Sequence, residues 1–208
     1  MNFNTFFSAK RVTGMAVLLA LVIVLQGALG TIMIGAVQLN FTLIPIVLGA
    51  ILYGPAVGGI LGFACGLVVL IQVMMGGSPF YAIIWTNTPL ITTLTCLVKT
   101  TVAGVVAGWL FRLLSEKHTL VGVFVASAIV PILNTVLFIL GCLCMNGSIV
   151  LFQNMLPDFI GMNPFIFILV GLVTFNFFIE LTINLVLSPT LYRVIGIVDK
   201  KFRKEKIW

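Results

Sequence analysis

The chain has 208 residues, of which 61% are hydrophobic and only 8% are charged, with a formal net charge of +6. A soluble domain of this length carries roughly 25% charged residues, because its outside must be covered with polar groups. The composition therefore excludes a soluble globular protein. It predicts an all-α integral membrane protein in which residues 1–208 form a single membrane domain.

Six apolar runs predict six transmembrane helices, since a bilayer requires ~20 apolar residues per helical span. In chain order they cover about residues 12–34, 41–52, 56–74, 88–114, 120–145 and 164–195. The second helix is short and stops at the turn signal Tyr53-Gly54-Pro55. Before it, the polar residues Gln38 and Asn40 are expected to mark the far membrane interface.

Two connecting segments are expected to be loops. Residues 76–79, Gly-Gly-Ser-Pro, open a loop that carries Phe80, Tyr81 and Trp85, which are residue types suited to a membrane interface. The second segment, residues 146–163, is polar, contains Pro157 and Asp158, and is followed by Pro164. Both loops fall on the same side of a six-helix arrangement.

The positive charges indicate the orientation of the chain. Apart from Lys99, every Lys and Arg lies near the N-terminus, between the fourth and fifth helices, or at the C-terminal end. The positive-inside rule then places both termini in the cytoplasm. Because these charges flank apolar runs, they indicate a multi-pass protein in the lipid of a cell membrane and no nucleic-acid partner.

No sequence signature of an enzyme or a metal site is present. The chain lacks the GxSxG, HExxH and GxxxxGK[ST] patterns of hydrolases, zinc proteases and nucleotide-binding loops. Its four cysteines lie inside apolar runs without zinc-site spacing, and His118 is expected to be solvated in a cytoplasmic loop. We therefore predict a binding protein with no cofactor, which would need another subunit to use ATP.

Two ionisable residues, Lys99 and Glu180, remain inside predicted transmembrane helices. A charge at mid-bilayer costs at least about 2.5–3.5 kcal/mol on insertion scales, so it normally faces a partner or a polar cavity. One interpretation is a Lys99–Glu180 ion pair that only joins two helices. The alternative is a ligand site in which Lys99 meets an anionic group of a small polar molecule.

Other polar residues share helix faces with these charges. Asn176 and Asn184 lie four residues on either side of Glu180, and Asn134 follows Pro131, where a broken helix ladder could free a carbonyl. Such residues can also serve as hydrogen bonds between helices. The pattern nevertheless predicts a polar pocket between the fourth, fifth and sixth helices. The candidate substrate-binding residues are Trp85, Asn87, Thr92, Thr95, Lys99, Asn134, Asn176, Glu180 and Asn184.

The first predicted helix carries small residues at the spacing that lets a second helix approach closely. Ala16 and Ala20 are four residues apart, and Gly27 lies on a neighbouring stripe. Small residues at this spacing serve either packing within the chain or the docking of a partner helix.

These features resemble the substrate-binding (S) component of an energy-coupling factor (ECF) vitamin transporter over nearly the whole length. The stretch Ala16-Val-Leu-Leu-Ala20 is similar to the alanine-rich AxxxA motif of that family. The segment Leu43–Pro55, with its Gly-Pro turn, also reads like the family. It is followed by glycines at positions 58, 59, 62 and 66.

The resemblance implies a division of labour between subunits. The chain would bind a vitamin near the outer side of a bacterial plasma membrane and topple to release it. A transmembrane coupling subunit and two ATP-binding-cassette ATPases would be its partners, and the ATPases would hydrolyse ATP. Ala16 and Ala20 would contact the coupling subunit, while residues 39–43 and the loop around Trp85 would gate the site.

The substrate is less constrained than the family. Lys99 favours a carboxylate-bearing vitamin, and pantothenate suits a small pocket with one cation and several amides. Riboflavin is the main alternative, since its ring would stack on aromatic side chains. A stand-alone secondary transporter or channel is a further alternative, although the sequence contains no inverted repeat.

Overall fold

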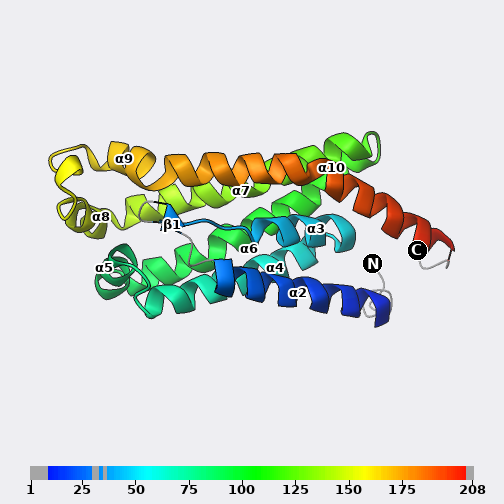
Figure 1. Ribbon diagram of the computed structural model, residues 1–208, viewed down its shortest axis with the longest axis horizontal. Helices are drawn as coiled ribbons and strands as arrows, with labels where there is room; N and C mark the ends of the chain where they lie inside the picture. Colours follow the sequence, from blue (N-terminus) through cyan, green and yellow to red (C-terminus); the bar gives the residue numbers. More distant parts are fainter. Residues whose placement is uncertain (1–8, 30–32, 35–36, 205–208) are drawn as a thin grey trace.

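The computed structural model describes residues 9–29, 33–34 and 37–204, which form a helical bundle and one short hairpin (Figure 1). The elements in chain order are α2 (Ala9–Leu29), β1 (Met33–Ile34), β2 (Val37–Gln38), α3 (Leu43–Tyr53), α4 (Pro55–Met74), α5 (Pro79–Asn87), α6 (Pro89–Ser115), α7 (Thr119–Cys144), α8 (Asn146–Gln153), the 3-10 helix η1 (Pro157–Phe159), α9 (Pro164–Phe167), the π-helix η2 (Ile168–Val173) and α10 (Thr174–Lys204). The helical class predicted from the composition is confirmed.

Several of these helices are suited to a bilayer. Those long and apolar enough to cross it are Pro55–Met74, Pro89–Ser115, Thr119–Cys144 and Pro164–Ile197. The apolar stretches Val12–Ala28 of α2 and Leu43–Tyr53 of α3 are shorter. With 11 residues, α3 extends about 16 Å, which is roughly half of the ~30 Å hydrocarbon core. A multi-pass membrane protein is thus confirmed, and the number of six spans stays a prediction.

The first helix is shorter than the apolar run predicts. It ends at Leu29 rather than Ile34, and Met33–Ile34 pairs antiparallel with Val37–Gln38. Hydropathy measures the length of an apolar run and not its backbone conformation, and the β-branched residues Ile34 and Val37 favour a strand. The hairpin therefore replaces the predicted end of the helix and enters the bundle before α3.

Both predicted outer loops contain helices. Pro79–Asn87 is helical because Ser78 caps its start, its hydroxyl accepting a 3.2 Å hydrogen bond from the Tyr81 N–H. Phe80 and Tyr81, expected at the membrane interface, are instead buried. In the second segment, α8 ends at Gln153, which holds the following turn in place. Its Nε2 donates hydrogen bonds to the carbonyls of Phe159 and Met162, each at 2.7 Å.

Glycines allow α4 and α6 to pack backbone against backbone. A Cβ at Gly62 would lie 2.2 Å from the Thr100 carbonyl oxygen, and one at Gly58 would lie 2.4 Å from that of Gly104. The Thr100 hydroxyl donates a 2.6 Å hydrogen bond to the Gly62 carbonyl. This contact holds α6 firmly and thereby positions the neighbouring Lys99.

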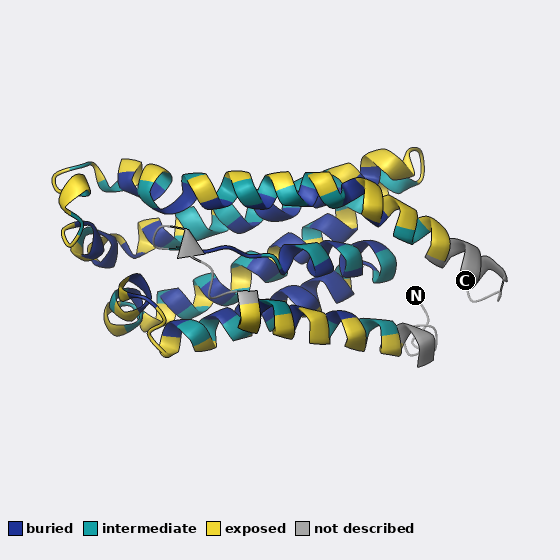
Figure 2. Cartoon of the chain, viewed as in Figure 1, coloured by how far each residue is buried: buried dark blue, intermediate teal, exposed yellow. Residues whose placement is uncertain are grey.

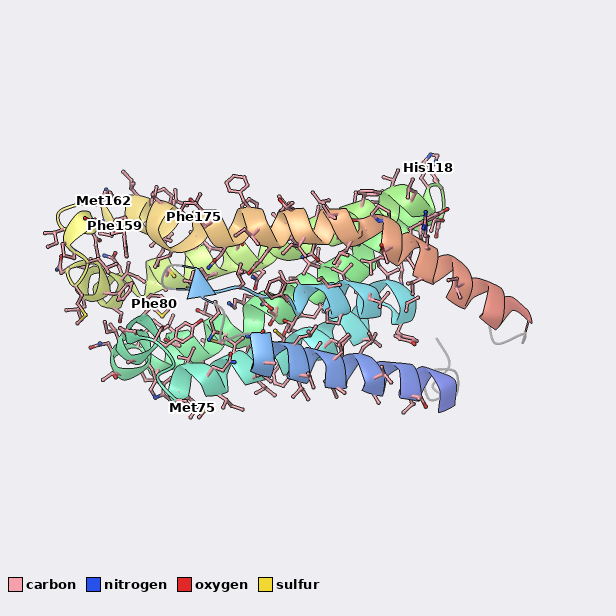
Figure 3. All side chains as sticks on the ribbon, in the orientation of Figure 1. Met75, Phe80, His118, Phe159, Met162 and Phe175 are labelled. Atoms are coloured by element: carbon pink, nitrogen blue, oxygen red, sulfur yellow. The ribbon has the colours of Figure 1, made fainter. Side chains whose placement is uncertain are left out.

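The two ends of the bundle present different elements. The start of α2 and the end of α10 lie at one end, and α5 and α8 lie at the other (Figure 1). His118 lies near the first of these ends, whereas Met75, Phe80 and Phe159 lie at the second (Figure 3). The described parts of both termini therefore share one end, and its cytoplasmic placement stays a prediction from the charge bias.

The outward faces of α2 and α10 are exposed (Figure 2), and they carry large apolar side chains. Val17 is 61% exposed, Phe175 68% and Val186 69%. A water-soluble monomer does not present apolar side chains in this density. These faces are therefore suited to contact with lipid or with another membrane helix.

Candidate ligand-binding site

A cavity of about 460 Å³, counting its open mouth, lies inside the bundle. Its wall combines polar and apolar side chains, as the walls of small-molecule sites do. Eight helices and strands and the segment after β2 contribute to the wall, and its residues are Gln26, Val37, Gln38, Asn40, Val69, Tyr81, Lys99, Asn134, Thr135, Phe138, Leu172, Val173, Asn176, Phe177 and Glu180. The predicted residues Lys99, Asn134, Asn176 and Glu180 thus meet at one cavity.

Lys99 reaches this cavity from α6. Its Nζ lies 5.1 Å from the centroid of the Phe138 ring, an arrangement in which the ring face stabilises the ammonium group. Among the described residues, no carboxylate oxygen lies within 4 Å of Lys99 Nζ. Lys99 and Glu180 therefore line the same cavity without the direct ion pair that would join two helices.

Glu180 connects α10 to the segment that follows the hairpin. Its Oε1 accepts a 2.9 Å hydrogen bond from the backbone N–H of Asn40, and the carboxyl group also interacts with the side chain of Asn134. One turn earlier, Asn176 Nδ2 donates a 3.0 Å hydrogen bond to the Val37 carbonyl. Two side chains of α10 thus hold the hairpin against the cavity.

Three amide oxygens of the cavity wall have no hydrogen-bond partner among the residues that the structure describes. They are Gln38 Oε1, Asn134 Oδ1 and Asn176 Oδ1, and each of these residues is at least nine-tenths buried. A buried polar atom without a partner costs about 1–3 kcal/mol. Most buried polar atoms in native proteins are satisfied, so three orphaned acceptors in one cavity are unusual.

A π-helix precedes the polar stripe of α10. In η2 the widened turn spans Ile168–Val173. Thr174 Oγ1 donates a 2.6 Å hydrogen bond to the carbonyl of Leu169, five residues earlier. Single π-turns inside helices change the direction of the residues that follow, frequently at functional sites. Here Leu172 and Val173 line the cavity directly before Asn176.

An adjoining cavity of about 350 Å³ shares Lys99, Tyr81 and Phe138 with the first. It is lined mainly by apolar side chains, with the predicted residues Thr92 and Thr95 in its wall. Both threonine hydroxyls are already used, since Thr92 donates to the Ile84 carbonyl at 3.0 Å and Thr95 donates to that of Ile91 at 2.8 Å. Lys99 therefore stands between a polar and an apolar compartment.

Like Thr92 and Thr95, three further predicted residues lie outside the wall of the main cavity. Asn184 lines a smaller neighbouring cavity, and its Nδ2 donates 2.8 Å to the Glu180 carbonyl. Trp85 is half-buried against the core, and Asn87 is exposed, with its Nδ2 bonded to the Ile83 carbonyl at 2.9 Å. Asn87 is therefore directed back onto its own helix.

Four residues that the sequence pattern did not predict at the site also line the cavity: Gln26, Gln38, Asn40 and Tyr81. Gln38 and Asn40 follow an apolar run, the same pattern that a membrane interface produces, and they were expected there. Gln26 is a polar residue inside the apolar run of α2, and this interruption was the one sequence signal for a cavity residue on that helix. In the structure it is 2% exposed, and its Nε2 donates 3.1 Å to Gln72 Oε1 of α4.

The comparisons with known proteins agree with this architecture. Residues 10–192 match the family described as "ECF transporter, substrate-specific component". None of the curated proteins compared with the chain matches it. The match covers every element from α2 into α10, including each residue of the cavity wall. The chain therefore belongs to the family of substrate-specific components of ECF transporters, as a substrate-binding rather than catalytic subunit in the cell membrane.

Proposed function

We propose that the chain binds a small carboxylate-bearing vitamin in the 460 Å³ cavity, with pantothenate as the best candidate. The observation that carries this proposal is Lys99, an ammonium group at the cavity wall with no carboxylate within 4 Å among the described residues. A cation in an apolar bundle requires a counter-charge or a polar cavity, and a ligand carboxylate supplies the counter-charge.

The other wall residues suit the uncharged part of such a ligand. Glu180, Asn134 and Asn176 would accept hydrogen bonds from its hydroxyl and amide groups. Asn184 supports the Glu180 backbone, while Thr92 and Thr95 shape the adjoining compartment. We further propose that residues 39–43 and the outer segment with Trp85 and Asn87 control access to the cavity.

The proposed partners are a transmembrane coupling subunit and two ABC ATPases, which would supply the energy for import. Ala16 and Ala20 are both exposed, and α2 lies at the edge of the bundle (Figure 2). Small exposed residues four apart allow a partner helix to approach closely. This supports α2 as the docking helix for the coupling subunit.

A riboflavin-type substrate is the second candidate, because Tyr81, Phe138 and Phe177 line the cavity and could contact a flat ring. Binding of pantothenate and riboflavin to the purified chain separates the two. Pantothenate is expected to raise the thermal midpoint and riboflavin to leave it unchanged. The reverse result would contradict a carboxylate-bearing substrate.

Transport assays in liposomes test the role of the chain within a complex. The chain alone is expected to retain its ligand without net import. Import is expected when the coupling subunit, the ATPases and ATP are added. Transport by the chain alone without ATP would instead favour a secondary transporter or a channel.

A further inference from the structure

We infer that Gln38 Oε1, Asn134 Oδ1 and Asn176 Oδ1 form an acceptor triad, which selects substrates that carry hydrogen-bond donors in addition to their carboxylate. This inference rests on the proposed function and extends it, because it specifies the second half of the ligand. The three oxygens come from β2, α7 and α10 respectively, and all three residues line the same cavity.

Burial makes the missing partners informative. Gln38 is 8% exposed, and Asn134 and Asn176 are 6% exposed, so bulk water does not satisfy these oxygens. Their surroundings fix their orientation in at least one case. Asn176 Nδ2 donates to the Val37 carbonyl, so the Oδ1 of the same amide must face away from that carbonyl.

Three donors of the cavity wall are already used within the chain. The Asn40 N–H is bonded to Glu180, Asn176 Nδ2 to the Val37 carbonyl, and Gln26 Nε2 to Gln72. These donors are therefore not available to the three amide oxygens. A ligand completes the triad by donating O–H or N–H bonds, while its carboxylate remains near Lys99.

This pattern defines a chemical class of substrate, namely a carboxylate that also carries at least two hydroxyl or amide N–H groups. A site built around hydrogen bonds rejects an analogue without the donors, because its buried acceptors then stay unpaired. Carboxylates with an apolar or aromatic remainder, such as lipoate and nicotinate, lack these donors. Pantothenate and biotin carry them.

The first test compares five compounds by the binding affinity of the purified full chain: pantothenate, biotin, lipoate, nicotinate and riboflavin. The tightest ligand is expected to be a donor-bearing carboxylate, at least about tenfold tighter than lipoate and nicotinate. Lipoate or nicotinate as the tightest ligand would overturn the triad while leaving the carboxylate proposal intact. Riboflavin as the tightest would instead contradict the carboxylate.

The second test uses variants that remove an acceptor with little change of shape. Gln38→Met and Asn134→Leu are each expected to weaken the tightest ligand at least about tenfold. Ser127→Ala is the matched control, because Ser127 Oγ on α7 is also buried and unpartnered but does not line the cavity. The Ser127→Ala variant is expected to bind the same ligand with unchanged affinity. If riboflavin is the tightest ligand, the same variants still test the triad, because the ribityl hydroxyls of riboflavin would be the groups that donate to these oxygens.

The third test needs no ligand. If Gln38 Oε1 lacks a partner, Gln38→Met should leave the thermal midpoint of the ligand-free chain unchanged or slightly higher. Asn134→Leu does not serve this test, because it also removes the contact between the Asn134 side chain and Glu180. A clear fall in the midpoint of Gln38→Met would mean that its oxygen is bonded within the chain. That result, or an unchanged ligand affinity in both variants, would overturn the triad.

Discussion

The backbone N–H of Asn40 donates a 2.9 Å hydrogen bond to Oε1 of Glu180, across 140 positions of the chain. This bond joins the segment after the hairpin to the centre of α10, at the wall of the ligand cavity. The buried Glu180 carboxyl group thus has a structural partner, and it also lines the proposed binding site. The first prediction separates these two roles.

Glu180→Leu is expected to release the segment around Asn40, since the substitution removes the acceptor and leaves a buried N–H without a partner. The loss corresponds to about 1–3 kcal/mol, so amide exchange at residues 37–42 should quicken roughly tenfold or more. Hydrogen–deuterium exchange of the ligand-free protein measures this. Glu180→Gln keeps an acceptor and serves as the control, and equal exchange in both variants would contradict the structural role.

Lys99→Met is expected to remove the preference for a carboxylate. Interactions with a charged group contribute about 1.5–3 kcal/mol, so pantothenate should bind roughly 10- to 150-fold more weakly. The neutral alcohol analogue of pantothenate, with a hydroxymethyl group in place of the carboxylate, should bind wild type and variant alike. Lys117→Met in the exposed α6–α7 connection is the matched control. Unchanged pantothenate affinity in Lys99→Met would contradict the assignment of Lys99 as the partner of the ligand carboxylate.

Ala16→Trp and Ala20→Trp are expected to prevent assembly with the coupling subunit while leaving ligand affinity intact. Both alanines are exposed on α2, and an indole ring there would hold a partner helix away. Co-purification of the coupling subunit with a tagged chain measures assembly. Ala82→Trp, an exposed position on α5, is the control. Full assembly of the α2 variants would rule out this face as the docking surface.

Gly62→Ala is expected to lower the free energy of unfolding by about 1–3 kcal/mol, as overpacking does elsewhere. Its Cβ would lie 2.2 Å from the Thr100 carbonyl oxygen, so α4 and α6 would have to separate. Gly196→Ala is the matched control, because nothing lies within 4 Å of its Cβ. Thermal unfolding in detergent compares the two, and equal midpoints would contradict the close helix packing.

The charge bias predicts that the end of the bundle with Lys117 faces the cytoplasm and that Asp158 faces outward. In a Cys144→Ser background, which removes the exposed cysteine, a membrane-impermeant maleimide should label Asp158→Cys in intact cells. Lys117→Cys should react only after permeabilisation. Labelling of Lys117→Cys in intact cells would reverse the predicted orientation.

Part of the candidate site could be predicted from the sequence. Lys99 and Glu180 stand out because a charge inside an apolar helix is costly unless it faces a cavity, and helical spacing then adds Asn176. All three line the observed cavity. Their role in binding a ligand stays a prediction.

The contribution of the hairpin could not be predicted in this way. Gln38 and Asn40 follow an apolar run, and that pattern is the same whether the chain leaves the membrane or folds back into the bundle. The helical form of residues 79–87 was missed for a similar reason, although Ser78 and Pro79 were a capping signal. Interface aromatics and buried aromatics are the same residue types.

The sequence by itself determined the membrane class, the apolar helices, the charge asymmetry and the costly charges inside the bundle. These are properties of single residues and of their transfer from water into lipid, so a linear pattern contains them. Only the tertiary structure decided that the hairpin lies against α10 and that Lys99 and Glu180 share a cavity without a direct ion pair. It also decided that three amide oxygens find no partner among the described residues. Those outcomes depend on distances between residues far apart in the chain, which local patterns do not encode.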